Sequence, residues 1–212
     1  MNIDRSRRLS LLAWIIVAFV IIADQAMKIW VKTSFYLGED LEIFPWFHLR
    51  FIQNNGMAFG IELGSKILLT TFRIALVAFL SWYLVKLTKA AKSPAGYVAS
   101  IALVIAGAFG NIVDCMFYGE IFSNPYPPFV AEFVPWGEGY GTLMQGLVVD
   151  MLYFPLFSFT WPSWVPGVGG SVFSFFDPVF NIADSAITVG MALIICFYSK
   201  YLTLPKQDEK AA

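Results

Sequence analysis

Acidic side chains inside apolar stretches are the residues of this sequence that could do chemistry. Asp24, Asp114, Asp150 and Asp184 each lie within or at the end of such a stretch, where an ionisable group is costly and typically functional. Two carboxyl groups held close together cannot both ionise, so one keeps a proton. The ionised member can take a proton from water while the protonated member polarises a carbonyl. Such a pair would hydrolyse an amide bond as an aspartic peptidase does, and we expect no metal or cofactor.

The sequence lacks the residues that other common hydrolytic sites require. His48 is the only histidine, which rules out the two-histidine zinc site of an H-E-x-x-H peptidase. No G-x-S-x-G sequence is present to carry a nucleophilic serine. We expect His48, which precedes a strand-like run, to be a surface or structural residue.

Two of the acids also have a structural explanation. Asp24 and Lys28 are four residues apart on one predicted helix, so a stabilising ion pair explains both. Asp114 lies one turn from Asn111 and could either line a site or hold helices together. The same N-I-small-D pattern recurs over residues 181–184, so each of two helices presents an amide and a carboxylate on one face.

Asp150 and Asp184 are harder to explain by structure alone. Asp150 ends the apolar run 146–149, and Asp184 belongs to the second N-I-small-D pattern. We therefore favour these two residues as the chemical pair. Arg73, inside another apolar stretch, is expected to snorkel or to pair with an acid.

The composition of the chain indicates that membrane-spanning helices position these acids. The chain of 212 residues is 58% hydrophobic, has a mean hydropathy of +0.67 and is only 14% charged, whereas a soluble domain is nearer one-quarter charged. A span needs about 20 mostly apolar residues. We expect one all-α membrane domain over residues 1–212 with four transmembrane helices, at about 9–31, 67–85, 97–118 and 178–202.

Basic residues predict the orientation of these helices. They cluster at the N-terminus, between the second and third spans, and after the fourth. The positive-inside rule puts both termini in the cytoplasm and the insertions 34–66 and 119–177 outside. The first span could be read as a cleaved signal peptide, but the polar residues that follow it favour a retained helix. The formal net charge of −1 suggests no nucleic-acid partner.

The depths of the acids agree with one another. At about 1.5 Å per residue, Asp24 lies about 22 Å above the inner start of the first span, and Asp184 about 9 Å below the outer start of the fourth. Asp114 lies at a similar depth, and Asp150 can reach it from the outer segment. All four therefore gather in the outer third of a hydrocarbon core of about 30 Å.

The outer segments carry strand and aromatic signals. Alternating runs at 41–43 and 47–52, followed by the turn residues 54–56, predict a small outer β-sheet. The segment 119–177 is rich in aromatic residues, which we interpret as interfacial anchors rather than ligand contacts. Within it, residues 119–149 join two candidate motifs and are either a lid or a passive outer decoration.

Two local expectations concern the fourth span and the cysteines. Asp177 can cap that helix and Pro178 suits its first position. Cys115 and Cys196 are expected at depths about 27 Å apart. A disulfide needs Cα atoms within about 7 Å, so both should be free thiols.

Five short stretches, in order along the chain, resemble the lipoprotein signal peptidase (signal peptidase II) family. Each stretch alone is weak, whereas all five on four spans of the right orientation are specific. They are Asp24-Gln25 with Lys28; Asn54-Asn55-Gly56-Met57-Ala58-Phe59-Gly60; Gly107-Ala108-Phe109-Gly110-Asn111 with Asp114; Val148-Val149-Asp150; and Phe180-Asn181-Ile182-Ala183-Asp184-Ser185.

The resemblance implies a multi-pass enzyme of the bacterial cytoplasmic membrane whose site is at the outer, periplasmic face. Such enzymes cut the signal peptide from prolipoproteins just before a cysteine that carries a diacylglyceryl group, and the substrate would enter from the surrounding membrane lipids. The catalytic pair falls on Asp150 and Asp184, while Asp24 and Lys28 match positions considered structural. The positions that line or support the site are Asn54, Gly56, Gly107, Asn111, Asp114, Asn181 and Ala183.

The sequence departs from the family pattern in two places. The family usually has an arginine directly after the aspartate of G-N-x-x-D, where this chain has Cys115, so a site cation is missing. Residues 115–149 also separate Asp114 from Asp150, where the family usually leaves only a few residues. We expect both changes to alter the mouth of the site more than its chemistry.

Two other classes of protein remain open from the residues alone. A proton-coupled transporter could use the acids as a relay, and a non-enzymatic assembly factor could use them to hold helices together. Four spans are few for a transporter, and the acids lie at one face rather than at the midplane. Cleavage of a diacylglyceryl-modified prolipoprotein by the purified protein would separate the three.

Overall fold

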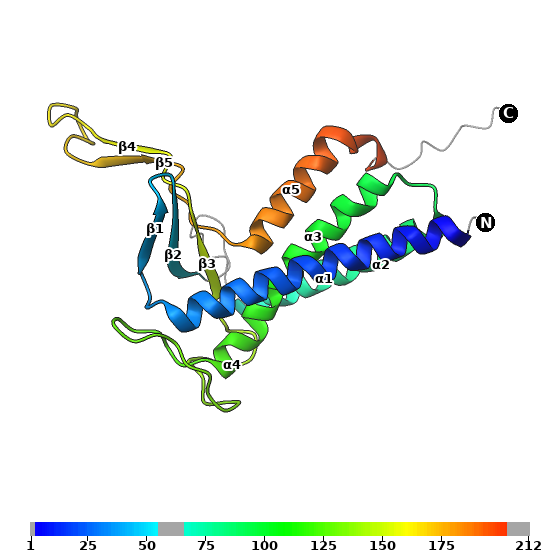
Figure 1. Cartoon of the computed structure of the whole chain (residues 1–212), viewed down its shortest axis with the longest axis horizontal. Coiled ribbons are helices and arrows are strands. Elements are labelled where there is room, and N and C mark those ends of the chain that lie inside the picture. Colours follow the sequence, from blue (N-terminus) through cyan, green and yellow to red (C-terminus); the bar gives the residue numbers. More distant parts are fainter. Residues whose placement is uncertain (1–2, 55–65, 203–212) are drawn as a thin grey trace.

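The computed structural model describes residues 3–54 and 66–202. Four helices form a bundle: α1 (Ile3–Ser34), α2 (Lys66–Ala90), α3 (Ala95–Val113) and α5 (Ile182–Phe197). Figure 1 shows the bundle at one end of the molecule and the strands at the other, with the N-terminus and the α2–α3 connection at the end away from the strands. The helix α3 packs against each of the other three and forms the middle of the bundle.

Three of the predicted spans are confirmed in length and composition. The helices α1 and α2, and α3 with its continuation to Ile121, are long and apolar enough to cross a membrane. The fourth is shorter than predicted, because α5 has 16 residues and reaches only about 24 Å. The predicted span 178–202 is therefore helical over 182–197, followed by the 3-10 turn η3 (Ser199–Tyr201).

The predicted start of the fourth helix is wrong. The helix begins at Ile182, and its N-cap is Asn181, whose side chain accepts the backbone N–H of Asp184. Asp177 instead accepts a hydrogen bond from the Tyr153 hydroxyl. The physical reason is that Phe180 exchanges backbone hydrogen bonds with residue 152, which keeps the chain extended until Asn181.

The end of α3 departs from regular α-helix. The π-helical turn η2 (Asp114–Tyr118) follows it, and the single α-helical turn α4 (Gly119–Ile121) follows η2 directly. Single π-turns inside helices often mark functional positions. Here the irregularity begins at Asp114, one of the four acids.

A three-stranded antiparallel sheet stands against the end of the bundle away from the N-terminus (Figure 1). Its strands are β1 (Asp40–Phe44), β2 (Phe47–Asn54) and β3 (Val148–Tyr153), in the order β1-β2-β3. The β1–β2 hairpin confirms the strands predicted at 41–43 and 47–52. Of the predicted turn that follows, residues 55 and 56 lie outside the described residues, so that part stays a prediction. Strand β3, which carries Asp150 opposite Ile52, was not predicted.

A second hairpin lies in the aromatic segment. It consists of β4 (Phe157–Thr160) and β5 (Val172–Phe175) and projects away from the bundle beyond the first sheet (Figure 1). Its rings stack on one another, with 4.8 Å between the centroids of Phe157 and Phe175, and remain exposed. That exposure is compatible with the predicted interfacial anchoring.

The insertion after α3 packs behind the sheet. Val149 and Met151 are buried on the face of β3 opposite Asp150, because side chains alternate along a strand. They share a core with Phe51 of β2 and with Phe122 and Ala131 of the insertion. The insertion is therefore joined to the back of the strand that carries Asp150. Both cysteines are free, as predicted.

Candidate active site

A cleft of about 970 Å³ lies where α2, α3 and α5 meet β2 and β3. Asp150 and Asp184 both line it, together with Asn54 and Asn111, so the structure brings the predicted pair to one cavity. Among the described residues of the insertion 119–149, only Val148, on strand β3, lines this cleft. The lid role of this insertion therefore stays a prediction.

Asp150 is the more deeply held member of the pair. It is 1% exposed and projects from the middle of β3. Its two oxygens face the amide nitrogens of Asn181, at 2.6 Å, and of Asn54. Burial, and next the negative charge of Asp184, raise the pKa of Asp150 to about 8. Near neutral pH the pair therefore keeps a proton.

Asp184 lies in the first turn of α5, where a negative charge interacts favourably with the helix dipole. Its backbone N–H donates to the Asn181 side chain at 2.8 Å, and its carboxylate Oδ1 accepts from Asn111 Nδ2 at 2.8 Å. The carboxylate of Asp184 thus accepts from Asn111, whereas Oδ1 of Asp150 accepts from Asn181. Both asparagines were predicted to support the site.

Asn181 connects the two aspartates and has only one possible amide orientation. Its Oδ1 accepts the backbone N–H of Asp184, which can only donate. Its Nδ2 must then face Asp150 Oδ1. Both oxygens of Asp150 therefore face an amide nitrogen, because its Oδ2 faces that of Asn54.

The predicted ion pair of Asp24 and Lys28 is confirmed, and it is larger than expected. Lys28 Nζ lies 2.9 Å from Asp24 and 2.8 Å from Asp114, and all three side chains are at most 1% exposed. Asp114 also accepts the Val149 backbone N–H at 3.3 Å. Asp114 thus holds β3 beside α3 and supports the pair.

Close helix contacts explain two of the small residues predicted near the site. A Cβ on Gly107 would stand 2.2 Å from the carbonyl oxygen of Ala183, so α3 and α5 can meet here only at a glycine. The Ala183 backbone N–H in turn donates to Asp24 at 2.9 Å. Gly56 lies outside the described residues, and its predicted role stays a prediction.

Sequence reasoning gave Gln25 no role, although Gln25 belongs to a stretch that carries the resemblance. Its amide nitrogen donates to Asp24 and to Asp114, and its oxygen accepts from the Tyr118 hydroxyl. It therefore joins the two acids that surround Lys28. The signal in the sequence was its place directly after Asp24.

Two arginines line the cleft, of which only one was singled out from the sequence. Arg50 comes from β2, and its guanidinium lies 5.5 Å from the centre of the Tyr153 ring. Arg73 comes from α2, and its Nη1 lies 3.6 Å from the Cys115 sulfur. A cation therefore stands beside Cys115 although α3 does not supply it. His48 pairs with Asp40 at 2.7 Å on the hairpin and confirms the expected surface role.

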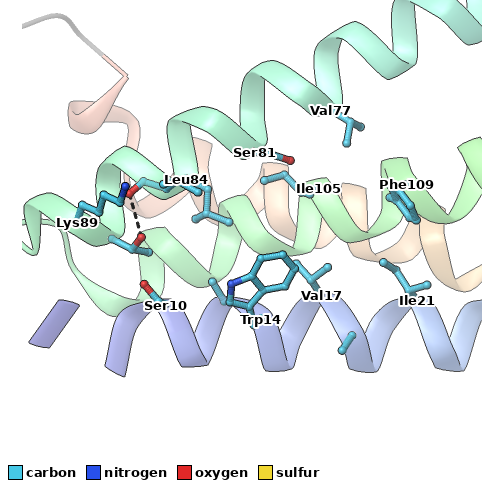
Figure 2. Close-up of a pocket in the computed structure, with 14 residues that line it drawn as sticks. Ser10, Trp14, Val17, Ile21, Val77, Ser81, Leu84, Lys89, Ile105 and Phe109 are labelled. Carbon is cyan, nitrogen blue, oxygen red and sulfur yellow. Dashed lines mark hydrogen bonds between the residues drawn. The ribbon is translucent and has the colours of Figure 1, made fainter. Parts of the chain in front are cut away.

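A second cavity of about 600 Å³ lies between α1, α2 and α3 (Figure 2). Its walls are mainly apolar, including Trp14, Leu84 and Phe109, with Ser10 and Lys89 toward one end. None of the four acids lines it. The cavity therefore has no group for hydrolysis, and the chemistry belongs to the cleft at β3. Within residues 3–54 and 66–202, no group of three His, Cys, Asp or Glu side chains could hold a metal ion.

Comparisons with known proteins point to one family. The model of the family described as signal peptidase (SPase) II matches residues 16–200. A lipoprotein signal peptidase of Porphyromonas gingivalis is 44% identical over 195 residues, covering 92% of this chain and 86% of the relative. One from Amoebophilus asiaticus is 35% identical over 202 residues, covering 92% and 81%. A solved bacterial membrane enzyme at 2.3 Å resolution is similar with a TM-score of 0.61 and 25% identity, covering 94% of this chain and 93% of that one.

Proposed function

This chain belongs to the signal peptidase II family of aspartic peptidases, which cleave signal peptides from prolipoproteins, and we propose that Asp150 and Asp184 are its catalytic pair. One observation carries the assignment: two carboxyl groups line one cleft, each oriented by an asparagine. Asp24 and Asp114 instead both form ion pairs with Lys28.

We assign the roles of acid and base from the protonation of the pair. Asp150, whose pKa is raised to about 8, donates its proton to the oxygen of the scissile carbonyl. Asp184, as a carboxylate, takes a proton from water, and the hydroxide oxygen bonds to the carbonyl carbon. The tetrahedral diol then collapses: a proton passes from Asp184 to the leaving nitrogen, the C–N bond breaks, and one hydroxyl returns its proton to Asp150. Both carboxyl groups end in their starting states.

The cleft continues from the acids along apolar helix faces. Leu80 of α2, Val104 of α3, and Ile187 and Met191 of α5 line this part. Such a wall suits the apolar segment of a signal peptide. We propose that the substrate is a prolipoprotein whose cysteine carries a diacylglyceryl group, and that the bond before this cysteine is cut.

The arrangement of charge supports a site at the outer face of the bacterial cytoplasmic membrane. The N-terminus and the α2–α3 connection lie together at the end opposite the strands (Figure 1), and Arg5 contacts the Ser93 carbonyl there at 3.2 Å. Basic residues cluster at this end, which the positive-inside rule assigns to the cytoplasm. Asp150, on β3, then faces the outer side.

The test is cleavage by the purified full-length protein. A diacylglyceryl-modified prolipoprotein should be cut directly before its cysteine, and mass spectrometry of both products locates the bond. The same prolipoprotein without lipid is the matched control. If protein shown to be folded does not cleave the lipidated substrate, the proposal is rejected and a non-enzymatic assembly factor is favoured.

A further inference from the structure

Lys28 has a contact that its two ion pairs do not explain. Its ammonium group donates to Asn111 Oδ1 at 2.8 Å, and the Nδ2 of the same asparagine donates to Asp184 Oδ1 at 2.8 Å. Lys28 is fully buried and Asn111 is 7% exposed. A continuous chain of hydrogen bonds therefore runs from α1 through α3 to α5 and ends at one member of the proposed catalytic pair.

The direction of this chain is set by Lys28. An ammonium group carries only donors, whereas an amide has one donor end and one acceptor end of similar size. The end of Asn111 that faces Lys28 must therefore be its oxygen, and the end that faces Asp184 must be its NH₂ group. Asn181 Nδ2, 3.2 Å from the same oxygen, favours this orientation but is a weaker constraint.

We propose that Lys28 is a positioning residue, which fixes the amide of Asn111 so that it always donates to Asp184. A donor at Oδ1 stabilises the carboxylate form and leaves Oδ2 to take the proton from water. Without Lys28 the amide keeps only the 3.2 Å contact from Asn181 at this oxygen, so it is more free to turn and place its oxygen against Asp184, where two acceptors repel. This role rests on the proposed function of Asp184 and extends it through the buried network.

The competing explanation is that Lys28 only neutralises Asp24 and Asp114. A variant that removes all three charges, Asp24→Asn/Lys28→Met/Asp114→Asn, separates the two explanations. The asparagine oxygens can still accept from the Ala183 and Val149 backbone N–H groups, so these two contacts persist. This variant has no charge to neutralise, but its Asn111 amide keeps only the longer contact from Asn181 and loses the one from Lys28.

We expect this variant to fold and to bind the lipidated substrate with a KM within about twofold of wild type, while kcat falls about 100-fold, the effect typical of a misplaced reacting group. If it does not fold, Lys28→Met/Asp114→Asn is compared with Asp114→Asn, each with and without Asn111→Ala, so that the effect through Asn111 is separated from that of the unpaired charge on Asp24. A wild-type kcat without Lys28, in either comparison, would overturn the proposal.

A double-mutant cycle adds a readout that a merely structural role would not move. Asn111→Ala removes the amide that Lys28 orients. Adding the three network substitutions to Asn111→Ala should then lower kcat no further. Losses that multiply would show that Lys28 does not act through Asn111 and would overturn the proposal. If the wild-type protein does not cleave at all, the proposed function fails, and the role of Lys28 fails with it.

Discussion

Asp24, in the first helix, accepts a hydrogen bond at 2.9 Å from the backbone N–H of Ala183, the residue directly before Asp184. The acid that looked structural from the sequence therefore also holds the start of α5. Because Asp24 also pairs with Lys28, one buried carboxylate ties the lysine network to the helix that carries Asp184.

The first prediction concerns the stability of this network. Lys28→Ala should destabilise the protein more than Asp24→Ala, because it leaves two buried acids unpaired, whereas Lys28 keeps Asp114 when Asp24 is lost. Breaking a buried pair typically costs about 3–5 kcal/mol. Thermal unfolding in detergent measures the order. The double variant Asp24→Ala/Lys28→Ala should lose less stability than the sum of the two single losses. Strictly additive losses would contradict the pairing.

The second prediction concerns the catalytic pair. Asp150→Asn and Asp184→Asn should each lower kcat by at least about 100-fold, since each removes an acid or a base from the reaction. Folding should persist, because asparagine preserves the shape of both side chains. Cleavage of a lipidated prolipoprotein at equal membrane abundance is the measurement. Near wild-type turnover in either variant would reject the pair.

The third prediction follows from the raised pKa of Asp150. The folded protein holds this proton up to about pH 8, whereas the unfolded chain loses it near 3.8. The unfolded state thus binds fewer protons between these values, so stability falls as pH rises from about 4 to about 8. Asp150→Asn cannot ionise and should be more stable than wild type at pH 8, with a smaller difference at pH 5. Equal pH dependence of the melting temperature in both proteins would contradict the shift.

The same pKa predicts the alkaline limit of activity. Above about pH 8 Asp150 of the free enzyme loses the proton that it must give to the carbonyl, so kcat/KM should fall there. The pH profile of kcat/KM measures this fall. Activity that continues to rise to pH 10 would assign the proton to a different group.

Local sequence patterns predicted much of the fold, but they did not predict contacts between residues that are far apart in the sequence. The spacing of Asp24 and Lys28 predicted their pair, and alternation predicted the β1–β2 hairpin. The strand β3 was missed because its partner, β2, lies about a hundred positions earlier, and its apolar run has no alternation. The start of α5 was misplaced because pairing of Phe180 with Leu152 overrides the local preference of a proline for the first helical turn.

The fifth prediction concerns a second buried lysine. Lys32 is fully buried, and among the described residues its Nζ has no hydrogen-bond partner. It lies 5.2 Å from the centre of the Phe122 ring and 4.9 Å from that of Tyr140. Lys32→Met keeps the apolar stem and removes a buried polar group, so it should raise the melting temperature. Lys32→Ala leaves a cavity and should lower it. A lower melting temperature in both variants would show that the ammonium group itself stabilises the aromatic cluster.

The last prediction concerns the insertion between Asp114 and Asp150. Its residues Phe122 and Ala131 are buried with Met151 behind β3, and none of its described residues from 119 to 147 lines the cleft. Replacing 123–138 with a short Gly/Ser linker removes Ala131 from this core and uncovers the back of the strand that carries Asp150.

We therefore expect a lower melting temperature and a lower kcat, because a looser β3 holds Asp150 less well, while KM for the lipidated substrate changes little. A lid would behave differently, since its loss would raise KM with the stability preserved. The single variant Ala131→Asp, which buries a charge in the same core and leaves the loop length intact, is the matched control and should lower stability in the same direction. A large rise in KM at unchanged stability in the linker variant would favour the lid hypothesis and show that the insertion reaches the substrate.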